Sequence, residues 1–154
     1  MRFRVSGLDP RSFDELHHLS DSTLVQRGMR RIDVTTRPGA PCRISLDDAE
    51  IGERVILLNH THQPADGPYR QQGPIFVRAG VTRAVFEDEI PPALARRPLS
   101  LRGFDAEHMM VEADLIEGAQ ASTLVNRFFE NPSVRYIHAH YAKRGCYAAL
   151  IERA

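Results

Sequence analysis

The sequence lacks the features that mark several large classes of protein. It has no tryptophan and no apolar run that approaches the length of a membrane-spanning helix. Its 20 basic and 20 acidic side chains cancel, and no run of like charge interrupts the mixture. A balanced, mixed surface of this kind argues against nucleic acid and against membranes as partners.

Short catalytic motifs are absent as well. The chain has no phosphate-binding glycine loop, no CxxC pair, no G-x-S-x-G nucleophile elbow and no HExxH helix. The first ten residues lack the apolar stretch of a signal peptide, so we expect a cytoplasmic protein. Only two cysteines are present, which suits a reducing compartment with free thiols, although the count leaves a bridge between Cys42 and Cys146 open.

What is present points to a small α+β protein. With 154 residues, of which 42% are hydrophobic, the chain can bury an adequate core as one domain, residues 1–154. Alternating patterns predict seven to nine strands, and helical patterns predict two to four short helices. We therefore expect a single domain with a mostly antiparallel β-sheet. The predicted strands cover residues 2–6, 30–36, 42–46, 54–62, 75–78, 99–104, 109–116, 134–141 and 146–151, and the clearest helix covers residues 119–131.

The last two strands predict a hairpin that carries two histidines and a cysteine. Alternation puts His138 and His140 on one face. A three-residue loop ending at Gly145 is favoured because glycine adopts the left-handed conformation that ends such a loop. This loop places Cys146 on the histidine face, His140 opposite Ala148 and His138 opposite Leu150. A two-residue loop would shift the register by one and put Cys146 on the other face.

Two His-x-His pairs are the sharpest chemical signal. Alternation along a strand aims both imidazoles of a pair the same way, as metal ligation requires. His60, His62, His138 and His140 therefore form an alternative set of ligands for zinc or another divalent metal, although the leading interpretation has no metal and no other cofactor. His60, His62, Asp66 and Gly73 also resemble part of the first cupin motif, which has glutamate where this chain has aspartate.

Two other patterns suggest binding or catalysis. A cysteine beside a histidine can act as an activated nucleophile, and Cys146 with His140 is the candidate pair, with His138 next to it. The segment 63–74 contains too many prolines and glycines for regular structure and delivers Tyr69 and Arg70, and the strand that follows ends at Arg78. The two arginines are candidate contacts for an anion.

Several stretches resemble a bacterial family known as domain of unknown function 1203. They are FRVSGLDP, GAPCRISLDDAEIGE, NHTHQPADGPYRQQGPIFVR, LSLRGFDAEHMM and YIHAHYAKRGCYAALIERA. The family pattern has an acidic residue where this chain has His60, and it carries no established activity. The resemblance implies a shared pocket formed by the matching residues Cys42, Arg43, His62, Tyr69, Arg70, Arg78, His138, His140 and Cys146.

The leading hypothesis is a small cytoplasmic protein with a pocket, lined by histidine, cysteine and arginine, for a small anionic molecule that it binds or transforms. The first alternative is a divalent-metal site on the same strands. The second is a non-catalytic interaction domain with an exposed strand edge, which would be favoured if the histidines were scattered and no pocket existed. The sequence leaves the formation of homo-oligomers open.

Overall fold

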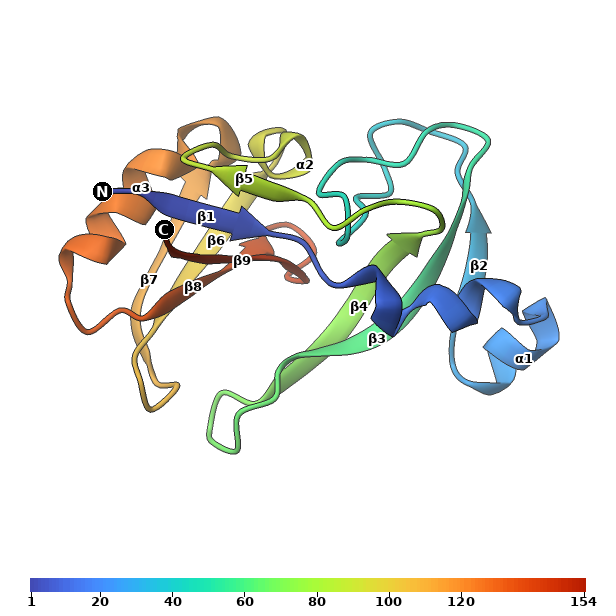
Figure 1. Ribbon diagram of the computed structural model, residues 1–154, viewed down its shortest axis with the longest axis horizontal. Helices are drawn as coiled ribbons and strands as arrows, with labels where there is room; N and C mark the ends of the chain where they lie inside the picture. The colour runs from blue at the N-terminus through green and yellow to red at the C-terminus, as the bar shows by residue number, and fades with distance from the viewer.

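A computed structural model describes residues 1–154, which form two antiparallel β-sheets (Figure 1). The strands of the large sheet lie in the order β5-β1-β9-β8-β6-β7, and those of the small sheet in the order β2-β3-β4. The large sheet consists of β1 (Phe3–Ser6), β5 (Val85–Glu87), β6 (Pro98–Phe104), β7 (Met110–Glu117), β8 (Tyr136–Tyr141) and β9 (Tyr147–Arg153), and the small sheet of β2 (Arg30–Asp33), β3 (Arg54–Gln63) and β4 (Gln71–Arg78).

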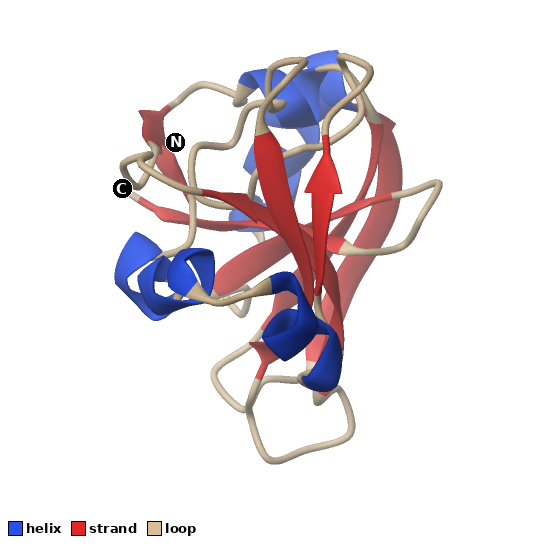
Figure 2. Ribbon diagram, turned by 90° about the vertical axis from the view of Figure 1, so that its right-hand side faces the viewer, coloured by secondary structure: helices blue, strands red, loops and turns tan.

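Three short α-helices complete the fold, which confirms the predicted α+β class. They are α1 (Asp21–Gln26), α2 (Pro92–Ala95) and α3 (Ala121–Glu130), and short 3₁₀ turns precede α1 and α3. Figure 2 shows the helices on the outside of the strands. None of the helices has the length and apolar character needed to cross a membrane.

Helix α3 confirms the clearest helix predicted from the sequence. Leu124, Val125 and Phe128 lie on one face, as predicted, and are buried in the core against the large sheet. The apolar face of β8, which carries Ile137 and Ala139, contributes to the same core. The opposite face of β8, which carries the two histidines, is therefore turned away from the helices.

The small sheet has its own core. Phe13 and Leu24, from the helical segment after β1, pack with Ile56 of β3 and Ile75 of β4. Strand β3 is central, as predicted, and β4 begins earlier than predicted, so that it includes Pro74. A proline is tolerated there because β4 is an edge strand whose outer amides need no partner.

The predicted strand at residues 42–46 is wrong. The segment forms a buried turn in which the Leu46 amide donates to the Cys42 carbonyl, and Leu46 has a positive φ of 55°. Only an isolated bridge from Cys42 to Phe76 resembles strand pairing. The apolar alternation that suggested a strand arises because Cys42, Ile44 and Leu46 are all buried within a turn between the two sheets. Strand β5 and helix α2 lie within residues 79–98, where no element was predicted.

The β8–β9 hairpin combines the two predicted registers. His138 lies opposite Leu150, as the favoured loop requires, but His140 lies opposite Tyr147 instead of Ala148. A β-bulge at this point shifts the register by one residue. Gly145 has a φ of +76°, as predicted. The side of the bulge next to the turn follows the register of the shorter loop, and this difference decides which face Cys146 occupies.

Gly7 fixes how the turn after Pro41 packs against the end of β1. A β-carbon at residue 7 would lie 2.1 Å from the carbonyl oxygen of Ile44. We expect Gly7→Ala to lower the free energy of unfolding by about 2–3 kcal/mol, since backbone must move to admit the methyl group. Urea unfolding followed by circular dichroism measures this change. Gly67→Ala is the matched control because no atom lies within 4 Å of a β-carbon there, and equal losses in both variants would contradict the prediction.

Candidate functional site

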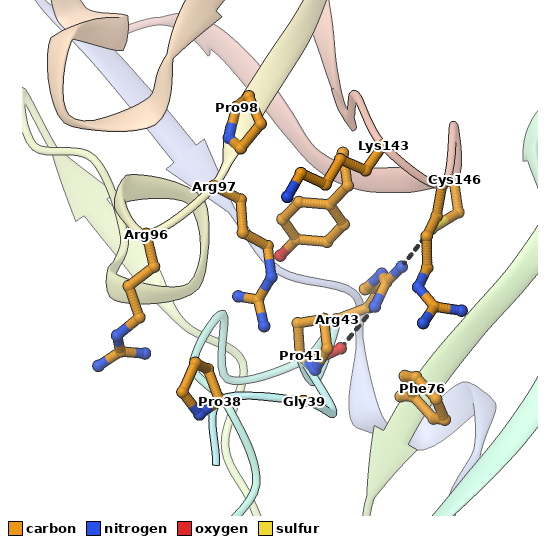
Figure 3. A pocket seen from close by; sticks show the side chains of 12 residues that line it. Pro38, Gly39, Pro41, Arg43, Phe76, Arg96, Arg97, Pro98, Lys143 and Cys146 are labelled. Carbon is orange, nitrogen blue, oxygen red and sulfur yellow. Dashed lines mark hydrogen bonds between the residues drawn. The ribbon is translucent and has the colours of Figure 1, made fainter. Parts of the chain in front are cut away.

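A cavity of about 320 Å³ lies beside the β8–β9 turn, and its volume suits a small molecule. Three separate parts of the chain supply cationic side chains to it: the turn after Pro41, the end of α2 and the β8–β9 turn. Figure 3 shows Arg43, Arg97 and Lys143 gathered around the cavity. The cationic lining residues are Arg43, Arg96, Arg97, Lys143 and Arg144.

Arg43 is the most deeply buried of these cations, with only 2% of its surface exposed. Its guanidinium group donates to the carbonyl oxygen of Tyr147 at 2.7 Å, to that of Pro41 at 2.6 Å and to the sulfur of Cys146 at 3.2 Å. No carboxylate forms an ion pair with it. A buried cation with only neutral acceptors leaves positive charge without compensation at the wall of the cavity.

Tyr141 contacts two of the guanidinium groups with its ring. The guanidinium carbon of Arg43 lies 4.9 Å from the centre of the Tyr141 ring, and that of Arg97 lies 5.2 Å from it. Burial raises the pKa of Tyr141 to about 12, although both arginines act in the opposite direction. The phenol is therefore neutral at pH 7, and its ring face stabilises both cations without cancelling their charge.

Two aspartates neutralise only part of this charge. Asp48 is fully buried and accepts hydrogen bonds from Arg97 and Arg96, and Asp47 accepts one from Arg96. Burial alone would raise the pKa of Asp48, but these hydrogen bonds and charges lower it overall, so that it is ionised at pH 7. Lys143 and Arg144 are exposed and have no carboxylate partner. The cavity therefore keeps an excess of positive charge.

A second group of side chains lies on the histidine face of the hairpin. The ring centre of His62, from β3, lies 5.0 Å from that of His140 and 6.0 Å from that of His138. The Tyr147 ring stacks on His62 at 5.1 Å and meets His138 edge-on at 5.3 Å. The structure thus brings together one member of the first His-x-His pair and both members of the second.

These histidines are neutral at pH 7. Burial, together with neighbouring charges, lowers the pKa of His138 to about 3 and that of His140 to about 4. Burial is also the main cause that lowers the pKa of His62 and of His60. The Nδ1 atoms of His62 and His138 are buried without a hydrogen-bond partner.

Cys146 does not join the histidines. Its sulfur contacts Arg43 in the basic cavity, whereas Tyr147 occupies the position on the histidine face that was predicted for the cysteine. His140 uses its Nδ1 to donate to the carbonyl oxygen of Gly145. The predicted thiol–imidazole pair between Cys146 and His140 is therefore wrong, because the bulge in β9 turns the cysteine to the opposite side of the hairpin.

The remaining predicted site residues lie elsewhere. Cys42 is a fully buried free thiol in the core of the small sheet, so the two cysteines form no bridge. Arg78 pairs with Glu53 at 3.0 Å, and Arg70 donates to the carbonyl oxygen of Pro64 at 3.3 Å. Tyr69 packs edge-on against Phe104, with ring centres 6.0 Å apart. Of these four, none lines the basic cavity.

His60 is separated from the three gathered histidines. Its ring packs against Phe13 and Tyr147, with ring-centre distances of 6.0 and 6.3 Å. As the side chains stand, no three His, Cys, Asp or Glu residues are arranged around one point as metal ligands. Both sheets also end in edge strands, unlike the closed barrel that a cupin motif implies. The histidines are nevertheless gathered and a pocket exists, so the condition that would favour a pure interaction domain is not met.

One known protein family matches most of the chain. A family model described as "Protein of unknown function (DUF1203)" matches residues 39–153. The chain belongs to this family. All the candidate site residues lie within the matched range, which also includes the whole lining of the basic cavity except Pro38. No curated protein and no solved structure matches the chain.

Several residues of the two sites in this DUF1203 protein were not identified from the sequence. Arg97 and Tyr141 form the basic cavity with Arg43, and Tyr147 and Arg102 lie at the histidines. Of the cavity residues, only Arg43 and Cys146 were named from the sequence, and the other basic residues that line it are the adjacent arginines at 96 and 97 and the basic turn at 143–144. The favoured three-residue loop did not place Tyr147 on the histidine face, because the bulge leaves no mark in the alternating pattern.

The buried neutral histidines predict that this DUF1203 protein loses stability in mild acid. Their folded pKa values lie below the ordinary value of 6.5, so the unfolded chain takes up protons first as the pH falls below 6.5. Each of His138 and His140 should then cost about 1.4 kcal/mol of stability per pH unit, until the folded pKa is reached. Urea unfolding at pH 7.5, 6.5 and 5.5 in EDTA measures the slope.

His140→Gln should make that slope shallower, because it removes one group that is protonated only on unfolding. His18→Gln, at an exposed position in the helical segment before α1, is the matched control and should keep the slope of the original chain. A slope that is unchanged in His140→Gln would contradict the prediction that His140 is protonated only on unfolding.

Proposed function

We propose that this DUF1203 protein binds a small molecule that carries a carboxylate or phosphate group, in the basic cavity around Arg43. The observation that carries the proposal is the buried guanidinium group of Arg43, which has carbonyl and sulfur acceptors but no carboxylate. A buried charge in that position raises the free energy of the folded protein unless a counter-ion binds next to it. Guanidinium groups match the geometry of carboxylates and phosphates. The two free cysteines further support a reducing, cytoplasmic location.

The arrangement of the cations around the cavity also suits an anion site. Arg43 and Arg97 contact the Tyr141 ring at the inner wall, and the exposed cations Lys143 and Arg144 lie at the rim. Cations at a rim attract an anion and increase its rate of association, whereas the buried cation Arg43 would hold it. The division between rim and wall makes the proposal testable without disturbing the core.

Binding is tested by isothermal titration with inorganic phosphate and with citrate at low ionic strength. Arg144→Ala and Lys143→Ala together should weaken binding about tenfold or more, because two uncompensated charges are lost from the rim. Arg135→Ala is the matched control, since Arg135 is exposed and does not line the cavity. Absence of binding by the original chain, or equal weakening by the control, would contradict the proposal.

A second candidate function, nucleophilic chemistry at Cys146, is favoured by the contact between its sulfur and Arg43. The thiolate is the reactive form of cysteine, and a neighbouring cation stabilises it. An anionic substrate held in the basic cavity would lie next to Cys146, which is one of the lining residues. The histidines on the other face cannot serve as its base, so Arg43 is the group that would activate it.

We expect iodoacetamide to label Cys146 in the folded protein and to leave Cys42 unlabelled, because Cys146 is partly exposed in the cavity and Cys42 is fully buried. Citrate or phosphate at saturating concentration should slow the labelling of Cys146 if the anion occupies the cavity. Peptide mass spectrometry after timed quenching measures both rates. Labelling of Cys42 at the same rate, or no effect of either anion, would contradict this prediction.

A further inference from the structure

The basic cavity has more room than an acidic group alone would fill. A carboxylate or phosphate group has about three to five heavy atoms, and at about 30 Å³ for each atom it fills at most about 150 Å³. The cavity measures about 320 Å³. More than half of this volume is therefore left for another part of the bound molecule, and the rest of the wall indicates what that part is.

Apolar rings form much of the rest of the wall. They come from four separate segments of the chain, which are the turn around Pro41, strand β4, the start of β6 and the end of β8. Figure 3 shows Phe76 and the prolines among the guanidinium groups. The rings belong to Pro38, Pro41, Phe76, Pro98 and Tyr141. An apolar wall that carries a few charged groups is typical of a pocket for a small organic molecule.

The polar side chains of the lining are almost all cationic. No serine, threonine, asparagine, glutamine, aspartate or glutamate lines the cavity, so the hydroxyl group of Tyr141 and the thiol of Cys146 are the only neutral polar side-chain groups there. A sugar would bring several O–H donors that find no carboxylate or amide acceptor on these side chains, and buried donors without acceptors weaken binding. The lining therefore favours a molecule whose body makes few hydrogen bonds.

A flat ring suits this wall better than a flexible chain does. Guanidinium groups and aromatic side chains both stack on the faces of aromatic rings, and the lining contains both kinds of group. Phe76 is only half-buried, so its ring is open to contact from within the cavity. A rigid ring also loses less conformational entropy on binding than a flexible chain of the same size.

We propose that the molecule bound in the basic cavity is a flat aromatic ring that carries one acidic group, a carboxylate or a phosphate. This inference rests on the proposed anion site and adds the class of molecule that the site takes. The acidic group lies at Arg43, whose guanidinium group has only neutral acceptors, and the aromatic ring lies against Phe76. The two positions are adjacent, because the backbone amide of Arg43 donates to the carbonyl oxygen of Phe76 at 3.0 Å.

The test compares ligands that share an acidic group, by isothermal titration of the full chain at pH 8. Phenyl phosphate should bind about tenfold or more tightly than inorganic phosphate, because its ring leaves water for the apolar wall. Glucose 6-phosphate should stay within about threefold of inorganic phosphate, because its hydroxyl groups find few acceptors. Benzoate against acetate repeats the comparison with a carboxylate, and the pair that binds more tightly identifies the acidic group. Benzoate should also bind at least about threefold more tightly than cyclohexanecarboxylate, whose ring is not flat.

Phe76→Ala should reduce the advantage of phenyl phosphate over inorganic phosphate to about threefold or less, because it removes an aromatic side chain from the wall. Tyr69→Ala is the matched control and should keep the advantage, since the Tyr69 ring packs against Phe104 outside the cavity. Circular dichroism checks that each variant is folded. The comparison of ligands uses the original chain and stays valid if Phe76→Ala unfolds. Phenyl phosphate should also protect Cys146 from iodoacetamide at lower concentration than inorganic phosphate does, because both would occupy the cavity that Cys146 lines.

The outcomes separate this inference from the proposed anion site. If inorganic phosphate binds but phenyl phosphate binds no more tightly, or if glucose 6-phosphate gains as much, the inference is overturned and the anion site stands. Equal affinity for benzoate and cyclohexanecarboxylate, or an advantage of phenyl phosphate that Phe76→Ala leaves intact, also overturns it. If none of these phosphates and carboxylates binds, the proposed anion site fails, and the inference fails with it.

Discussion

The buried guanidinium group of Arg43 holds together segments that are far apart in the sequence. Its side chain binds the carbonyl oxygen of Pro41 and that of Tyr147, and its backbone amide and carbonyl bind Phe76 and Leu8. One residue thus connects the end of β1, an edge strand of the small sheet and the last hairpin of the large sheet. Hydrogen bonds from a charged donor are stronger than neutral ones, and replacing Arg43 would remove a hydrogen bond from each of two backbone carbonyl groups.

The neutral hydrogen-bond acceptors of Arg43 also explain why the cavity is basic. Because carbonyl groups are neutral acceptors, they satisfy the hydrogen bonds of Arg43 without cancelling its charge. Asp48, by contrast, cancels the charge of Arg97 as well as fixing its position. In the cavity, Arg43 therefore has hydrogen-bond partners but no opposite charge, whereas Arg97 has an opposite charge in Asp48. This difference is the physical basis of the proposed anion site.

The bulge in β9 separates the two candidate sites. On one side of the hairpin the Cys146 sulfur contacts Arg43, and on the other the Tyr147 ring packs against the histidines. Tyr147 also links the sites, since its carbonyl oxygen accepts from Arg43 while its ring stacks on His62. Tyr147 is therefore in contact with both groups of side chains.

The sequence by itself determined the α+β class, the amphipathic helix α3, the central position of β3 and the shared face of His138 and His140. These depend on periodicity and local propensity, which act within a few residues. It also determined the family. Only the tertiary structure decided that residues 42–46 form a turn, that Cys146 faces Arg43, and that Arg97 and Tyr141 complete the cavity. A buried turn and a half-buried strand can show the same alternation of apolar residues in the sequence. A one-residue bulge reverses the faces that alternation predicts. Contacts between distant segments depend on tertiary packing, which no local pattern encodes.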